Sequence, residues 1–103
     1  MNRQLNQMSG EQKADFTPKQ GQYLAFIDAY ARLNQRPPAE ADMQRFFGVS
    51  PPSVHHMVLI LERAGLIRRR PGAPRSIEVL VPPEDLPALQ PETQPVKTSA
   101  TSY

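Results

Sequence analysis

One stretch, residues 48–67, constrains the fold of this 103-residue chain more than any other. Gly48 can adopt the left-handed conformation that ends a preceding helix, and Ser50 followed by Pro51 is typical of a helix start. Gly65 is expected to stop the helix before a strand begins at residue 66. Between these signals, apolar residues recur at helical spacing, at Val54, Met57 or Val58, Leu61 and Ala64. The pattern predicts a helix over 50–64 with a polar first turn and one buried face.

A longer helix is predicted upstream. Thr17 as N-cap, Pro18 at the first helical position and Gln20 as capping-box partner mark its start. It is expected to end near Leu33, with Asn34 as the left-handed residue. Its apolar stripe consists of Leu24, Ile27 and Ala31, flanked by Tyr23 and Tyr30. The Arg-Pro-Pro sequence at 36–38 then predicts an extended connector, because proline disfavours helix at itself and at the residue before it.

A short helix is predicted over 39–47. Met43 and Phe47 are four residues apart and are expected to face the core, which leaves Phe46 near the surface. Glu40 and Asp42 lie in the first turn, where carboxylates interact favourably with the helix dipole. This helix, the turn at 48–50 and the helix over 50–64 together predict a helix-turn-helix.

The pattern changes after Gly65. Residues 66–70 and 76–81 are expected to pair as two strands, since residues 71–75 are rich in turn formers. Ile77 and Val79 alternate with Glu78, as expected for a strand with one buried face. A two-stranded hairpin is only marginally stable alone, so it must pack on the helices as a wing. The predicted class is mainly α (α+β), a three-helix winged helix-turn-helix with a C-terminal two-stranded β wing.

Composition suggests three segments. Residues 1–15 are polar without periodicity and are interpreted as a flexible N-terminal arm, and residues 16–81 form the winged domain. Residues 82–103 are rich in proline and polar residues and are expected to be disordered, apart from a brief docking through Leu86 and Leu89. The chain has no cysteine, no signal peptide is visible, and its apolar run at 57–61 is too short to cross a membrane. These features predict a cytoplasmic protein without membrane contact.

The winged segment is more basic than the whole chain. Residues 16–81 contain nine Lys and Arg residues against five Asp and Glu residues, and eight of the nine are arginine. A guanidinium group matches phosphate and guanine edges better than an ammonium group does. This balance favours a nucleic-acid partner, although arginine-rich surfaces are also common on other proteins.

Two sets of residues are candidates for contacts with double-stranded DNA. Short or planar polar groups at the start of the helix over 50–64 are sized to reach base edges in the major groove: Ser50, Pro52, Ser53, His55 and His56. Side chains of the wing and of the 36–45 region are candidates for the DNA backbone: Arg36, Arg45, Arg68, Arg69, Arg70, Arg75 and Ser76. The wing arginines have an alternative explanation, since basic residues also discourage pairing at an exposed strand edge.

Other chemistries find little support. Adjacent helical residues point about 100° apart, so His55 and His56 are not expected to hold one metal ion. No nucleophile–base set or paired carboxylates stand out, so neither an enzyme nor a cofactor is expected. Two roles are open for both Phe46 and Leu59: packing under the wing, or contact with a second subunit. They also keep open the alternative of a winged-helix protein–protein interaction module without DNA binding.

Five landmarks occur in order with almost no gaps. They are the Thr-x-x-Gln helix start, Tyr23-Leu24 with Ile27, the Arg-Pro-Pro link, the Gly-Val-Ser-Pro turn, and the Ala-Gly-Leu-Ile step into the wing. On these residues, the chain from 16 to 81 resembles the N-terminal DNA-binding domain of the LexA repressor family. The resemblance implies a winged domain of a transcriptional regulator, with its third helix in the major groove and its wing on the backbone. Separately, single winged domains usually bind weakly, so a homodimer on a palindromic site would increase the affinity.

The chain also departs from that family. The second half of a LexA repressor is a self-cleaving serine–lysine peptidase domain, and the only lysine after residue 81 is Lys97, in a tail too short to form a fold. The resemblance is therefore to a stand-alone DNA-binding domain, and autoproteolysis is not expected. The start of the third helix carries different groups at Pro52, Ser53, His55 and His56. The operator sequence of LexA is therefore not expected to carry over.

Overall fold

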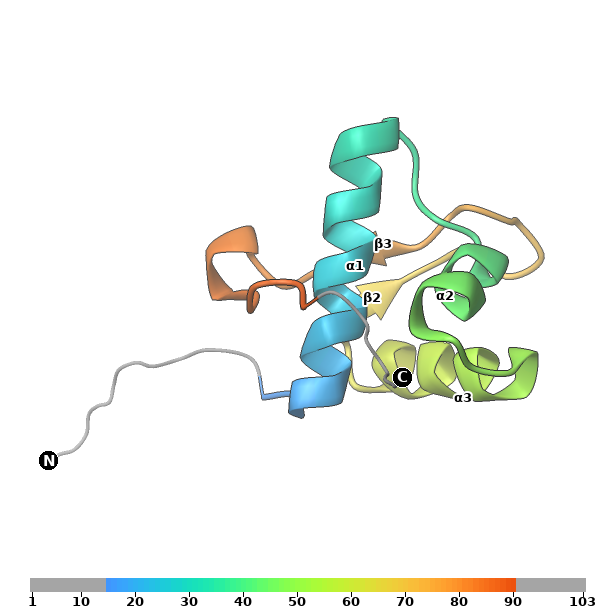
Figure 1. Cartoon of the computed structure of the whole chain (residues 1–103), viewed down its shortest axis with the longest axis horizontal. Helices are drawn as coiled ribbons and strands as arrows, with labels where there is room; N and C mark the ends of the chain where they lie inside the picture. The colour runs from blue at the N-terminus through green and yellow to red at the C-terminus, as the bar shows by residue number, and fades with distance from the viewer. Residues whose placement is uncertain (1–14, 91–103) are drawn as a thin grey trace, which may run out of the picture.

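The computed structural model describes residues 15–90. Three helices, α1 (Pro18–Asn34), α2 (Glu40–Phe47) and α3 (Pro51–Arg63), precede two short strands, β2 (Ile67–Arg68) and β3 (Glu78–Val79). The strands pair as an antiparallel sheet, and a 3-10 turn, η1 (Pro83–Asp85), follows them. Figure 1 shows α2 and α3 packed together, with α1 and the hairpin beside them. This arrangement confirms the predicted mainly helical, winged helix-turn-helix fold.

The core lies where the three helices and β2 meet. Leu24 and Ile27 from α1, Met43 from α2 and Ile67 from β2 are almost completely buried. α3 contributes Val54, Val58 and Leu61, which are also fully buried. Truncating one such side chain to alanine typically costs about 2–5 kcal/mol, a large share of the stability of a small domain.

The buried stripe of α3 differs from the predicted one at its end. The sequence left open whether Met57 or Val58 lies in the stripe. Val58 is fully buried, whereas Met57 is only half-buried. Ala64 was expected to close the stripe but is exposed. It is the C-terminal cap of α3, and Gly65 follows with a φ of 77° that turns the chain toward β2. The end of the stripe therefore points away from the core because the helix has already ended.

The start of α1 is as predicted. Thr17 Oγ1 accepts the N–H of Gln20 at 3.1 Å, and Gln20 Oε1 accepts the N–H of Thr17 at 2.9 Å. The predicted end is wrong by one residue. Asn34 stays helical, and Gln35 adopts the left-handed conformation with φ 59°. The Asn34 side-chain amide donates to the carbonyl of Tyr30 at 3.0 Å, which ties Asn34 back to the last turn of the helix.

An aromatic cluster joins α1 to α2. Tyr23 stacks on Phe47, with ring centroids 4.1 Å apart. Phe46 is half-buried with its ring 4.6 Å from that of Phe26, so it is not left at the surface as expected. Phe26, for which no role was predicted, is buried and contacts both phenylalanines of α2. Phe46 therefore belongs to the packing of the domain.

The strands of the wing are shorter than predicted. Only Ile67 with Val79 and Arg68 with Glu78 pair across the sheet, followed by a hydrogen bond from Leu80 N–H to Leu66 C=O at 2.9 Å. The expected strands over 66–70 and 76–81 are interrupted because the Arg70 N–H donates to Ser76 Oγ at 2.9 Å and not to a facing carbonyl. A side chain thus replaces the backbone ladder at the turn end of the hairpin.

Residues 82–90, here called the strap, pack along α1. Leu86 and Leu89 lie against the core, as predicted for a docking segment. Gln22 holds the strap from α1: its amide nitrogen donates to Ala88 C=O at 3.0 Å, and its amide oxygen accepts the N–H of Gln90 at 2.7 Å. Of the predicted flexible arm over 1–15 and the predicted disordered tail over 82–103, residues 1–14 and 91–103 lie outside the described residues.

Candidate nucleic-acid interface

The polar start of α3 projects outward. Ser50, Pro52, Ser53, His55 and His56, the candidates for base contacts, are all exposed. Ser50 is the N-cap, and its hydroxyl oxygen accepts the N–H of Ser53. The two serine hydroxyls also lie 2.9 Å apart. Ser50 is therefore occupied in starting the helix, whereas Ser53 presents a hydroxyl that is fixed in position by its neighbour.

The two histidines differ in their surroundings. His55 Nδ1 lies 3.2 Å from Glu40 Oε2, which links the start of α3 to the first turn of α2. His56 is exposed on the next position of the helix. Within residues 15–90, no group of three or more potential ligands is placed to hold a metal ion. The histidine pair therefore offers two different polar groups at one helix start.

The arginines of the wing fall into paired and unpaired groups. Arg68 Nε donates to Glu78 Oε1 at 2.8 Å across the hairpin, with both side chains well exposed. Arg69 Nε donates to Glu62 Oε1 at 3.1 Å and is only 20% exposed, so it fastens the wing to α3. Arg70 is exposed, and only its backbone is held, by Ser76. Arg68 and Arg70 are thus exposed, whereas Arg69 between them is directed toward α3.

Arg36 and Arg45 lie near α2. Arg45 is 72% exposed and pairs with Asp42. Arg36 is exposed on the connector before α2. Of the six arginines proposed from the sequence to meet phosphate, only Arg36 and Arg70 have no salt bridge to another residue within 15–90. These two side chains are the most available to an incoming anion.

Arg75 and Ser76 lie differently from the sequence prediction. Both were predicted to face the DNA backbone, yet Arg75 turns inward. Its Nη1 donates to Asp42 Oδ2 at 3.0 Å, Tyr30 Oη at 3.1 Å and Pro37 C=O at 3.2 Å. The Ser76 hydroxyl accepts from the Arg70 N–H and donates to Ala73 C=O at 2.8 Å. In the structure, both residues shape the wing and hold it against the helices.

Asp42 is the buried charge of the site. Its side chain is 8% exposed, and it accepts hydrogen bonds from Arg75, Arg45 and the Ala39 N–H. Burial acts to raise the pKa of Asp42, but the Ala39 N–H and the two guanidinium groups outweigh burial and hold the pKa below its usual value. The sequence singled out Asp42 only for its favourable position in the helix dipole, so this role was missed.

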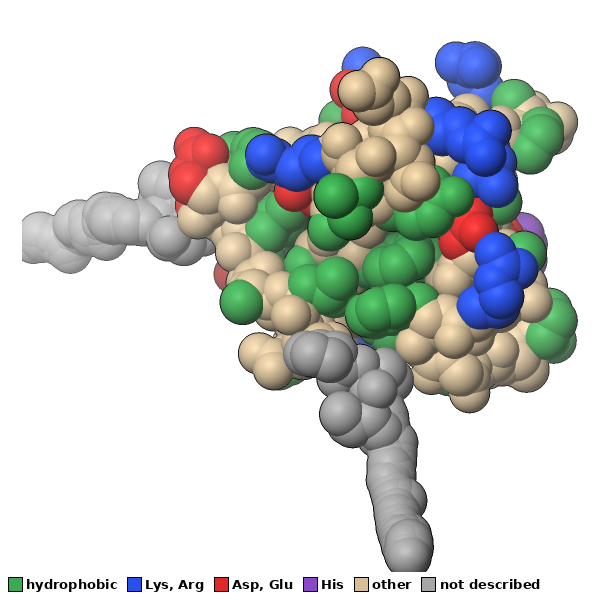
Figure 2. All heavy atoms as spheres, turned by 45° about the horizontal axis from the view of Figure 1, so that its top comes forward, with side chains coloured by type: hydrophobic (Ala, Val, Ile, Leu, Met, Phe, Trp, Pro, Cys, Tyr) green, Lys and Arg blue, Asp and Glu red, His purple; other side chains and the backbone are tan. Residues whose placement is uncertain are grey.

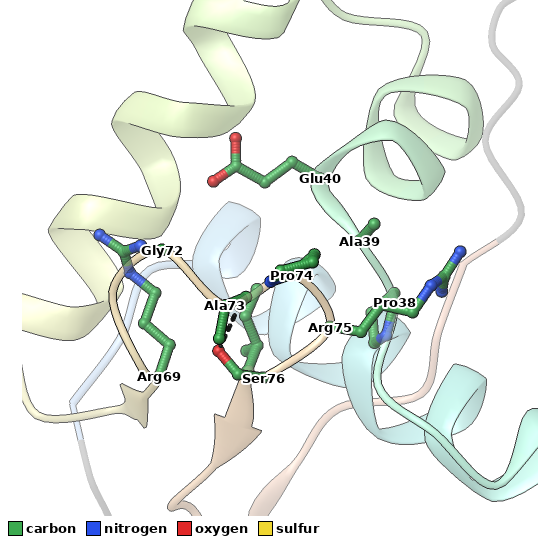
Figure 3. Close-up of a pocket in the computed structure, with 10 residues that line it drawn as sticks. Pro38, Ala39, Glu40, Arg69, Gly72, Ala73, Pro74, Arg75 and Ser76 are labelled. Carbon is green, nitrogen blue, oxygen red and sulfur yellow. Dashed lines mark hydrogen bonds between the residues drawn. The ribbon is translucent and has the colours of Figure 1, made fainter.

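A hollow of about 350 Å³ separates the start of α2 from the loop between β2 and β3, here called the wing turn. Figure 3 shows Arg69 and Arg75 on opposite sides of the wing turn, with the Ser76–Ala73 hydrogen bond between them. Glu40 lies across the hollow with its carboxylate directed toward α3. The hollow therefore lies between the elements that carry the predicted contacts.

The two predicted contact regions lie on one side of the molecule. In Figure 1, the first turn of α3 and the loop between β2 and β3 are both at the right. Figure 2 shows Lys and Arg side chains gathered on that side, near a histidine. Among the helices within residues 15–90, none is long and apolar enough to span a membrane.

Comparison with known proteins identifies the family. The sequence model of the LexA DNA binding domain matches residues 13–76. The LexA repressors of Thermosipho africanus and Frankia alni are 36% and 37% identical over 70 residues, which is 68% and 67% of this chain and 35% and 28% of theirs. The LexA repressor of Thermotoga neapolitana is 34% identical over 65 residues, 63% of this chain and 33% of its own.

The chain therefore spans about a third of the length of the curated relatives that it matches. The matched region contains all three helices, β2 and most of the wing turn. Since the family match covers more than half of the sequence, this chain belongs to the LexA DNA-binding domain family.

Proposed function

We propose that this chain binds double-stranded DNA sequence-specifically as a small bacterial-type transcriptional regulator. In this proposal α3 enters the major groove and the wing lies on the sugar–phosphate backbone. One observation carries the proposal: the exposed start of α3 and the wing turn lie on the same side of the molecule, together with the gathered cationic side chains. The family match and the relatives, which are named repressors, support it.

The proposed roles divide between the two regions. Ser53 and His56 are the side chains best placed to read bases, because both are exposed and three residues apart on one helical face. Arg70 and Arg36 are proposed to contact phosphates, since both are exposed and unpaired within residues 15–90. Arg68 is proposed as a further phosphate contact after exchange of Glu78 for the phosphate.

Selection from a randomised duplex pool tests this function. The whole chain is expected to enrich one sequence class, and log K for that sequence should fall linearly with log salt. Ser53→Ala or His56→Ala should change which sequence is enriched, whereas Arg70→Ala should weaken binding to all sequences and flatten the salt dependence. Failure to retain any duplex at low salt would contradict the proposal and favour a protein-interaction module.

We also propose that two copies bind a palindromic site in the cytoplasm, and that the chain acts as a regulator and not as an enzyme. Of the arginines proposed to meet phosphate, only Arg36 and Arg70 form no salt bridge within residues 15–90, so a second copy would strengthen binding through a second half-site. Sedimentation of the chain with duplexes containing one or two half-sites tests this. The two-site duplex should bind two copies at concentrations where the one-site duplex is largely free.

A further inference from the structure

The Asp42 carboxylate joins elements that are far apart in the sequence. It lies in the first turn of α2 and is only 8% exposed. One oxygen accepts the Ala39 N–H at 2.8 Å and the Arg75 guanidinium at 3.0 Å, and the other accepts Arg45. A buried carboxylate with these partners is strongly held, since removing one partner leaves the others incompletely satisfied.

Arg75 connects that carboxylate to the wing. It lies in the wing turn with φ 56°, a left-handed conformation that is uncommon for a residue other than glycine. Its Nη1 contacts α1 through Tyr30, the connector through Pro37, and α2 through Asp42. We call the Asp42–Arg75 salt bridge with these supporting contacts the latch.

The wing has few other restraints on this side. The two strands share only two residue pairs, and a short hairpin is marginal by itself. Arg69 fastens the outgoing strand to α3 through Glu62, and the buried Ile77 anchors the returning strand. Between those anchors, the latch is the charged contact that fixes the part of the turn just before β3. Arg75 lies next to Ser76, whose hydroxyl holds the Arg70 N–H.

We propose that Asp42 is a positioning residue for DNA binding: through Arg75, it holds the wing turn at a fixed place relative to α3, so that Arg70 meets a phosphate while α3 meets the bases. Asp42 itself touches no DNA in this arrangement. The inference rests on the proposed function, because it describes how the two contact regions of that function are kept in register.

The direction in which Asp42→Asn changes the affinity for DNA distinguishes this role from simple electrostatics. A carboxylate near a phosphate chain opposes binding, so Asp42→Asn would tighten binding to DNA if charge were the only effect. The latch predicts the opposite, because the freed wing turn no longer presents Arg70. We expect Asp42→Asn to weaken binding by up to about 8-fold at 0.1 M salt. This is the factor by which one phosphate contact, with a slope of log K against log salt of about 0.9, raises the affinity between 1 M and 0.1 M salt.

A double-mutant cycle on the full chain makes the test specific. In the wild type, Arg70→Ala should reduce the slope of log K against log salt by about 0.9. In the Asp42→Asn or Arg75→Met background, Arg70→Ala should change the slope and affinity much less. Additive effects of Arg70→Ala and Arg75→Met would overturn the proposal, because they would mean that Arg75 contacts phosphate independently.

Glu84→Gln is the matched control. Glu84 is exposed in η1, at the opposite side of Figure 1 from the wing turn, so its replacement removes one negative charge without touching the latch. It should leave the effect of Arg70→Ala unchanged. Thermal unfolding establishes that each variant is folded at the assay temperature, and Arg75→Met alone completes the cycle if Asp42→Asn does not fold.

Amide hydrogen exchange distinguishes the latch from the proposed function. If the wild type binds no duplex, both the proposed function and the positioning role for DNA binding are refuted. Faster exchange at the Arg70 N–H in Asp42→Asn than in the wild type supports the latch in either case, because that N–H is protected by its bond to Ser76. Unchanged exchange there would overturn the latch.

Discussion

Replacing Glu78 by Gln should strengthen DNA binding, in contrast to the loss expected at Asp42. Glu78 pairs with Arg68 across the hairpin at 2.8 Å, and the two side chains are 57% and 69% exposed. An exposed pair of this kind contributes about 0–1 kcal/mol to stability, so it can be exchanged for a phosphate at little cost. The Glu78 carboxylate nevertheless repels that phosphate, and the amide does not.

The size of the gain follows from Coulomb's law. At roughly 6 Å in water, two unit charges repel by about 0.7 kcal/mol, and screening at physiological salt lowers this to about 0.3 kcal/mol. Glu78→Gln should therefore tighten binding by about 1.7-fold at physiological salt and by up to about threefold at low salt. Stability should fall by less than about 1 kcal/mol.

Fluorescence anisotropy with a labelled duplex at several salt concentrations measures both the affinity and the slope. Arg68→Ala should weaken binding more in the Glu78→Gln background than in the wild type, because Arg68 is then free of its internal partner. Lys19→Ala, an exposed charge change in the first turn of α1, controls for long-range attraction. Unchanged or weaker binding of Glu78→Gln would refute the assignment of Arg68 to phosphate.

Three further predictions concern stability. Because the pKa of Asp42 is lowered in the folded state, the stability lost in Asp42→Asn should be full at neutral pH and should shrink as pH falls below about 3.9; urea unfolding at pH 7 and pH 3 measures this difference. Gly21→Ala should destabilise the chain by about 1–3 kcal/mol and expose the strap to proteolysis, since a Cβ there would lie 2.9 Å from Phe16 Cε1 and 3.0 Å from Pro87 Cγ. Ser50→Ala removes the N-cap of α3 and should cost about 1 kcal/mol in thermal or urea unfolding, whereas Ser50→Asp, which keeps an accepting oxygen, should lose less.

The elements that sequence analysis predicted correctly are specified by neighbours in the chain. The capping box of Thr17 and Gln20 and the cap of Ser50 operate over three residues, so their residue types are sufficient signals. Gly48 adopts φ 65° with open space around it, so its conformation alone explains the turn. Helical periodicity then identified Val54 and Leu61 as core positions.

The parts that were missed depend on partners distant in the sequence. Arg75 contacts residues 33, 38 and 45 positions away, and no local pattern indicates that its side chain turns inward. The length of the strands was overestimated for a related reason, because the Ser76 hydroxyl competes with the backbone ladder for the Arg70 N–H. A serine or an arginine in a predicted hairpin carries no sequence signal that separates these roles from DNA contact.

Internal ion pairs determine how much of the positive charge can serve DNA. Arg45, Arg68, Arg69 and Arg75 each pair with an acid of the domain, and two of the pairs share the buried Asp42. Each counterion released by a phosphate contact adds about 0.9 to the salt slope, so a slope near 1.8 would correspond to Arg36 and Arg70 of one copy. Exchange of Glu78 for phosphate would raise it toward 2.7, and two copies on one duplex would double either value. A slope well above 2.7 for a single bound copy would require further cations on phosphate. These would be the exposed Arg63 or Lys19, a cation outside residues 15–90, or an arginine released from its pair with Glu62 or Asp42.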